Sequence, residues 1–139
     1  MVQKKEKNLW QSQKQKPFFQ KDIQDVWSTV TSLEHYQWRN DISKVEIISD
    51  KQFVEYTKDG YATTFTTTAF EPLKRWEFDM ENSNMTGHWT GVFSVQDGQT
   101  KIEFTEDVTA KKLLMKPFVK MYLRKQQECY VSDLRKALQ

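Results

Sequence analysis

The chain has little cysteine, glycine or proline. Its 139 residues include one cysteine, Cys129, so an intramolecular disulfide cannot form and a disulfide-stabilised secreted scaffold is excluded. Only 4 Gly and 3 Pro are present, and no Gly/Ser-rich or Pro-rich linker divides the sequence. We therefore expect one domain over residues 1–139, with residues 1–8 as a frayed N-terminal tail, in a reducing cytoplasm.

Long apolar runs and an excess of charge of one sign are also missing. No stretch approaches the roughly 18 apolar residues of a spanning helix, and no apolar segment follows the charged start of the chain. We therefore expect neither secretion nor stable membrane insertion. The net charge is +2, from 21 basic and 19 acidic residues, so the overall field does not favour a nucleic-acid partner.

Several signatures of chemistry are absent as well. The sequence has only two histidines and one cysteine, without the spacing of metal-ligand motifs, so we expect no metal site. It also lacks a Gly-rich phosphate loop and the Gly-x-Ser-x-Gly turn of many hydrolases. We expect no cofactor.

Aromatic residues, in contrast, are plentiful. The chain carries 9 Phe, 5 Tyr and 5 Trp, far more than a disordered chain would contain. The arrangement of these aromatic residues must therefore indicate the function.

The amino-terminal third predicts a strand and two short helices. Residues 9–19 read as a polar strand, which Pro17 restricts to an edge or a bulge. Asp22 and Asp25 open an amphipathic helix over residues 23–32, with Asp22 as its N-cap. Ser32 starts a second short helix that ends near residues 38–41.

The rest of the chain predicts a run of strands and a long helix. Apolar residues alternate with a period of two, and Asp59-Gly60 and Asp97-Gly98 mark hairpin turns. The predicted strands cover residues 44–49, 52–58, 61–70, 73–81, 86–96 and 100–108. After Ala110 the period returns to 3.6, with Pro117 in the first turn of a long helix.

These elements predict an α+β domain. A curved antiparallel sheet of about seven strands would wrap around the long C-terminal helix, with two short helices after the first strand. The helix cannot fill the whole concave side, so a small apolar ligand could sit in the gap.

The order and spacing of four motifs resemble the SRPBCC superfamily, which includes START proteins, the birch-pollen allergen and polyketide cyclase/dehydrases. The motifs are residues 22–27, 36–38, 70–72 and 97–102. The resemblance implies a helix-grip fold and a cavity for hydrophobic molecules, with catalysis in some members only. It also implies that Trp27 and Trp38 lie where the two short helices meet the open end of the sheet. The polar first strand departs from the family pattern.

Strand parity and helix position predict which side chains line the cavity. Trp76 and Phe78 share one face of a strand, and Trp89 and Phe104 lie on the corresponding faces of later strands. Met115, Phe118 and Tyr122 would form the ceiling on the long helix. Packing against each other in a core is the alternative for all seven. The candidate ligand-binding residues are Trp76, Phe78, Trp89, Phe104, Met115, Phe118 and Tyr122.

Three residues are candidates for proton transfer. Glu106 has the parity of Ile102 and Phe104, which would point its carboxylate inward and raise its pKa by desolvation. A bulge that turns Glu106 to solvent is the interpretation we favour, because the residue lies near a strand end. His88 has the parity opposite to Trp89, so we expect it on the outer face. Tyr122 is the third candidate.

The remaining polar features have ordinary explanations. We expect Cys129 to be a buried, unreactive thiol on the long helix and His35 to lie on a helix surface. The basic residues that recur every four positions read as a solvated helix face rather than a binding site. They are Lys112, Lys116, Lys120 and Arg124.

Three functions are compatible with the sequence. The leading hypothesis is binding or carriage of a small lipid-, polyketide- or aromatic-like ligand between the sheet and the long helix. The alternative is a cyclase/dehydratase-type enzyme that acts on a polyketide-like substrate in the same cavity, with Glu106, Tyr122 or His88 moving a proton. An interaction module that uses the basic face is the third. The oligomeric state stays open.

Overall fold

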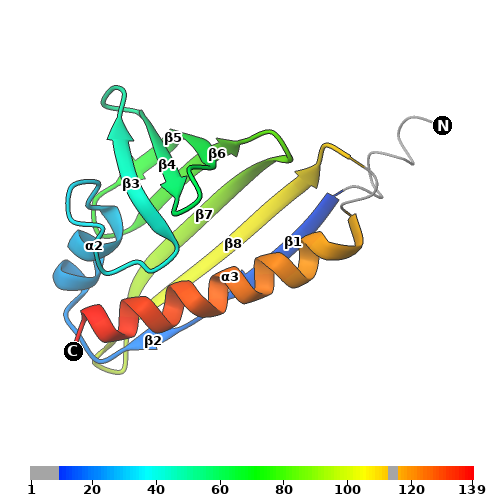
Figure 1. Cartoon of the computed structure of the whole chain (residues 1–139). Helices are drawn as coiled ribbons and strands as arrows, with labels where there is room; N and C mark the ends of the chain where they lie inside the picture. The colour runs from blue at the N-terminus through cyan, green and yellow to red at the C-terminus, as the bar shows by residue number, and fades with distance from the viewer. Residues whose placement is uncertain (1–9, 113–115) are drawn as a thin grey trace.

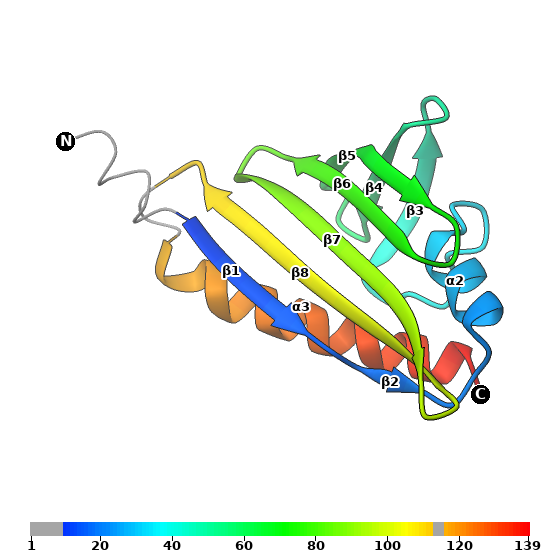
Figure 2. The same cartoon turned by 180° about the vertical axis from the view of Figure 1, so that it is seen from behind.

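The computed structural model describes residues 10–112 and 116–139, and its elements follow the order that the sequence predicts except for the second short helix. They are β1 (Trp10–Gln15), β2 (Phe18–Phe19), α2 (Ile23–Thr31), β3 (Ile42–Ile47), β4 (Gln52–Thr57), β5 (Ala62–Glu71), β6 (Arg75–Glu81), β7 (Met85–Gln96), β8 (Gln99–Ala110) and α3 (Lys116–Ala137). Figure 1 shows α3 lying along a strongly curved sheet, and Figure 2 shows β1, β7 and β8 from the other side, in front of α3. The helix-on-sheet α+β architecture is confirmed. The predicted tail at residues 1–8 lies outside the described residues.

The strands form one antiparallel, 8-stranded sheet in the order β1-β8-β7-β6-β5-β4-β3, with β2 paired to β8 off this path. Strands β3 to β8 are therefore the predicted meander. In the β7–β8 hairpin, Asp97 and Gly98 have φ of 53° and 75°, the left-handed conformations of a tight two-residue turn. Gly60, in the β4–β5 hairpin, has φ of 83°.

Strand β1 closes the sheet next to β8 despite its polar sequence. Its residues pair continuously with β8, from Trp10 opposite Thr109 to Gln15 opposite Phe104. Pro17 interrupts the ladder because it has no N–H to donate, and β2 resumes the pairing with Phe18 opposite Lys101. The first strand is thus a wall of the sheet, and proline divides it into two segments.

Helix α2 forms as predicted, with its apolar face against the sheet. Val26, Trp27 and Val30 are its buried residues, and the Trp27 ring packs edge-to-face on Phe93 with centroids 4.8 Å apart. The predicted side-chain cap is wrong, because Asp22 makes no capping hydrogen bond. The helix is therefore stabilised by packing rather than by a capping box.

The predicted second short helix is also wrong, because residues 32–41 form an irregular loop with a turn at residues 37–38 instead. Tertiary contacts hold this segment. Asp133 of α3 accepts hydrogen bonds from the backbone and the side chain of Asn40, at 2.9 and 2.8 Å, and the Trp38 ring packs edge-to-face on Tyr130. These two contacts fix the end of the segment against α3.

Helix α3 begins at Lys116, and Pro117 lies in its first turn as predicted. Its inner face is set by residues four or seven positions apart that are at most 3% exposed: Val119, Leu123, Gln127 and Leu134. Val119 and Leu123 pack with Val108 and Ala110 of β8 in a small cluster. A larger aromatic cluster fills the space between α2, the sheet and the last turns of α3.

Candidate functional site

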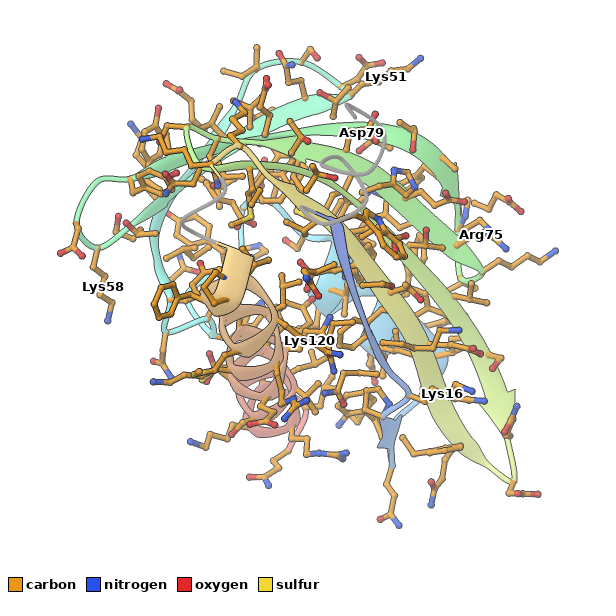
Figure 3. All side chains as sticks on the ribbon, turned by 90° about the vertical axis from the view of Figure 1, so that its right-hand side faces the viewer. Lys16, Lys51, Lys58, Arg75, Asp79 and Lys120 are labelled. Carbon is orange, nitrogen blue, oxygen red and sulfur yellow. The ribbon has the colours of Figure 1, made fainter. Side chains whose placement is uncertain are left out.

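A cavity of about 430 Å³ opens between α3 and the concave face of the sheet. This volume lies within the range of about 300–1,000 Å³ that is usual for small-molecule sites. Side chains of β3 to β8 form its walls, and residues 122–130 of α3 and the loop over residues 32–41 close it. Figure 3 shows the sheet arching over α3 with side chains filling the space between them.

Most of the candidate ligand-binding residues line this cavity. They are Trp76, Phe78, Trp89, Phe104 and Tyr122. Phe118 is 66% exposed and lies outside the cavity, which corrects its predicted place in the ceiling. Phe118 and Tyr122 are four residues apart and lie on the same side of α3. The α3 residues that line the cavity begin at Tyr122, so Phe118 lies about one turn before the cavity. Met115 lies outside the described residues.

The aromatic wall is a continuous set of ring contacts. Phe78 and Trp89 stack with centroids 4.9 Å apart and planes 8° apart, and Trp76 meets Phe78 edge-on at 5.0 Å. Phe53 and Phe65 stack in the same way at 4.9 Å. Because each ring is held by its neighbours, the apolar surface of the cavity is preorganised.

Gly91 makes room for one of these rings. A methyl group at Gly91 would collide with the six-membered ring of Trp89, two residues earlier in β7. The Trp89 side chain therefore leans over the backbone of Gly91. Glycine is required here for space, because any side chain would displace the ring.

Glu106 points into the cavity, so the bulge that we favoured is wrong. The β7–β8 register runs without a break and places Glu106 opposite Trp89. Gln127 of α3 donates a hydrogen bond to the Glu106 carboxylate at 3.0 Å. Burial raises the pKa of Glu106 to about 7, although the Gln127 hydrogen bond and the charge of Arg39 favour the ionised form.

Arg39 forms a second polar group in the cavity, which the sequence analysis missed. Its guanidinium pairs with Glu55 at 2.6 Å and with Asp41 at 2.7 Å and lies 5.4 Å from the centroid of the Tyr130 ring. Burial lowers the pKa of Arg39, but these two carboxylates outweigh it and raise the net value. Glu55 shares strand parity with the buried Phe53, an available sign of an inward carboxylate that needs a partner.

His88 lies on the convex face of the sheet, as predicted, and therefore does not reach the cavity. Its ring nitrogens lie 2.7 Å from Asp79 and 2.9 Å from Glu77. Burial lowers the pKa of His88, but the two hydrogen bonds outweigh it and raise the net value. Figure 3 shows Asp79 on the outer side of the sheet, away from α3.

The remaining expectations concern Cys129, the histidine in the loop between α2 and β3, and the basic residues. Cys129 is exposed and contributes to the cavity lining, which corrects the buried thiol. His35 is exposed, but in a loop rather than a helix. Lys112, Lys120 and Arg124 of the basic face are exposed, as expected of a solvated surface.

The fold has close counterparts among solved structures. A START superfamily protein from Mycobacterium smegmatis superposes with a TM-score of 0.78 at 16% identity, over 91% of this chain and 96% of that one. The chain has the START-like helix-grip fold. The di-domain ARO/CYC StfQ from the steffimycin biosynthetic pathway gives a TM-score of 0.75 at 14% identity, over 98% of this chain and 53% of that one. Ara h 8.0201 gives a TM-score of 0.74 at 11% identity, over 93% of this chain and 97% of that one.

Sequence comparison adds nothing to this START-like assignment. No protein-family model matches the chain, and no curated protein matches it significantly. Among the described residues, no helix is both long enough and apolar enough to cross a membrane.

Proposed function

We propose that this START-like chain binds or carries a small hydrophobic ligand in the cavity between the sheet and α3. The observation that carries the proposal is the preorganised aromatic wall of a cavity of about 430 Å³. A lipid-, polyketide- or aromatic-like molecule would bury apolar surface there, and each Å² removed from water favours binding by about 25 cal/mol. The helix-grip fold supports this proposal, and we place the protein in the cytoplasm without a nucleic-acid partner.

The test uses two aromatic residues on the same helix. Tyr122 lines the cavity and Phe118 does not, although both are exposed by half or more. We expect Nile red, a neutral dye that brightens in apolar surroundings, to bind saturably to the wild-type protein. Tyr122→Glu should weaken this binding at least about tenfold, because it brings a charge to the apolar site, and Phe118→Glu should leave it unchanged. Equal effects of both substitutions would contradict the site.

A cyclase/dehydratase-type enzyme is a second candidate, favoured by one observation. Glu106 is a cavity carboxylate whose pKa is raised to about 7 by burial, and a group with such a pKa suits proton transfer near neutral pH. Tyr122 lies at the same cavity, whereas His88 lies on the other face and is not part of this proposal. If a polyketide-like substrate is turned over, Glu106→Gln should abolish turnover and keep binding. Turnover that survives this substitution would rule out Glu106 as the base.

A further inference from the structure

The charges inside the cavity are unequally partnered. The charged residues of the lining are Arg39, Lys125, Asp41, Glu55 and Glu106. The Arg39 guanidinium already binds Asp41 and Glu55, at 2.7 and 2.6 Å, so this group carries more negative than positive charge. Lys125 is exposed to solvent.

Among the described residues, Glu106 is the carboxylate of the lining that no cation contacts directly, although the charge of Arg39 acts on it from a greater distance. Within residues 10–112 and 116–139 it forms no salt bridge, and its hydrogen-bond partner is the neutral amide of Gln127. That amide nitrogen also donates to the backbone oxygen of Gln13 at 3.2 Å. Both bonds need the Nε2 hydrogens, so Gln127 is fixed as a donor and offers Glu106 no positive charge.

The surroundings of Glu106 make this missing charge costly. Trp89 lies directly opposite in β7 and Phe104 lies two residues earlier on the same face, and their rings are 5.9 Å apart. A carboxylate beside apolar rings is poorly solvated, and an opposite charge brought close to it is attracted strongly in such a medium. A ligand anion would meet the carboxylates of Glu55 and Glu106, and a neutral apolar ligand would leave Glu106 without a charged partner.

We propose that the preferred ligands are hydrophobic amines, whose cationic nitrogen pairs with the Glu106 carboxylate while their apolar body packs on the aromatic wall. This inference rests on the proposed function, because it assigns a ligand class to the same cavity. Binding combines the burial of the apolar body with an ion pair between the cationic nitrogen and the Glu106 carboxylate. No covalent bond is made or broken.

The test compares three probes that share a naphthylmethyl body. One carries a trimethylammonium group, one a tert-butyl group of similar shape, and one a carboxylate. At pH 8 we expect the cation to bind wild-type protein at least about tenfold more tightly than the neutral probe, and the anion to bind most weakly. In Glu106→Gln the preference for the cation should disappear, while affinity for the neutral probe stays, which also shows that the variant is folded.

Glu103→Gln is the matched control. Glu103 is on the same strand with the opposite parity and pairs with Lys14 and Lys16 at the surface, so its loss should leave the preference for the cation intact. A wild-type protein that binds the cation no better than the neutral probe overturns the proposal, as does a preference that survives in Glu106→Gln. If Nile red binds and the cation does not, the amine class is wrong and the cavity stands; if Nile red also fails, the proposed function is wrong.

The proton balance gives a second readout. A permanent cation that pairs with Glu106 selects the ionised carboxylate, so binding at pH 6 should release a proton, measured by calorimetry in buffers of different ionisation enthalpy. The other titratable side chains of the lining are Tyr36, Arg39, Asp41, Glu55, Tyr61, Tyr122, Lys125, Cys129 and Tyr130. Proton release that persists in Glu106→Gln would assign the effect to one of these groups and contradict the proposal.

Discussion

Trp89 of β7 lies directly across the ladder from Glu106 of β8, and both side chains line the cavity. Side chains at opposed positions of an antiparallel pair have Cβ atoms about 4.5–5.5 Å apart. An aromatic ring and a carboxylate therefore lie next to each other on the concave face. This pair joins the apolar and the polar properties on which ligand binding depends.

The buried carboxylate should make stability depend on pH. The pKa of Glu106 is raised from 4.5 to about 7 in the folded protein, so the unfolded chain loses its proton first as pH rises. The free energy of unfolding should then fall between about pH 4.5 and pH 7, by a few kcal/mol at most, and level off above. Glu106→Gln removes this cost, so it should stabilise the protein more at pH 8 than at pH 4.5. Urea denaturation at the two pH values would measure the difference, and equal shifts would contradict a buried Glu106.

Gly91→Ala should destabilise the protein through the Trp89 ring. The added methyl group collides with that ring, and overpacking of a core costs about 1–3 kcal/mol. Trp89→Phe removes the colliding atoms, so Gly91→Ala should cost less in that background. A double-mutant cycle by urea denaturation would measure this coupling. A substitution that is neutral in the wild-type background would refute the close approach.

Trp27 and Trp10 should differ greatly in their contribution to stability. Trp27 is 7% exposed and Trp10 is 51% exposed. Trp27→Ala should cost about 3–5 kcal/mol, because it leaves a cavity among Phe93 and Phe70. Trp10→Ala should cost about 1 kcal/mol or less. Thermal or urea unfolding would compare them, and equal costs would mean that the first residue of β1 is as deeply packed as α2.

The histidine on the convex face should stabilise the protein mainly at low pH. The pKa of His88 is raised in the folded state, so its contribution is fully present below its ordinary value of 6.5 and is lost as pH rises through the folded value. His88→Gln should therefore destabilise the protein more at pH 5.5 than at pH 9. His35→Gln, at the exposed second histidine, is the control variant. A loss that is the same at both pH values would argue against the ion pairs with Glu77 and Asp79.

The strands and their inward faces could be predicted because they depend on local pattern. Alternation with a period of two identified Trp76, Phe78, Trp89 and Phe104 as one face, and Asp97-Gly98 marked a turn whose residues both have positive φ. These features follow from neighbours in the sequence. The same alternation pointed Glu106 inward, and our preference for a bulge set that evidence aside.

The features that the sequence missed depend on contacts between distant segments. Arg39, in the loop after α2, forms a salt bridge with Glu55 of β4. Asn40 donates a hydrogen bond to Asp133, which lies 93 residues later in the chain. Such a contact cannot be read from the neighbouring sequence that predicted a second helix. How far the cavity extends along α3 is also a tertiary property: its lining includes Tyr122 but not Phe118, one turn earlier. Periodicity places Phe118 and Tyr122 on one side of the helix, but it does not show where along the helix the cavity ends.

The chain's five tryptophans offer the most direct test of ligand binding in the cavity. Trp38, Trp76 and Trp89 line the cavity, whereas Trp10 and Trp27 do not. Each indole N–H gives its own signal in a ¹H–¹⁵N NMR spectrum, so one titration with an apolar ligand such as the neutral naphthyl probe reports on all of them. We expect saturable shifts of the Trp38, Trp76 and Trp89 signals, with those of Trp10 and Trp27 nearly unchanged. Shifts confined to Trp10 and Trp27, or no saturable shift at all, would contradict binding in this cavity.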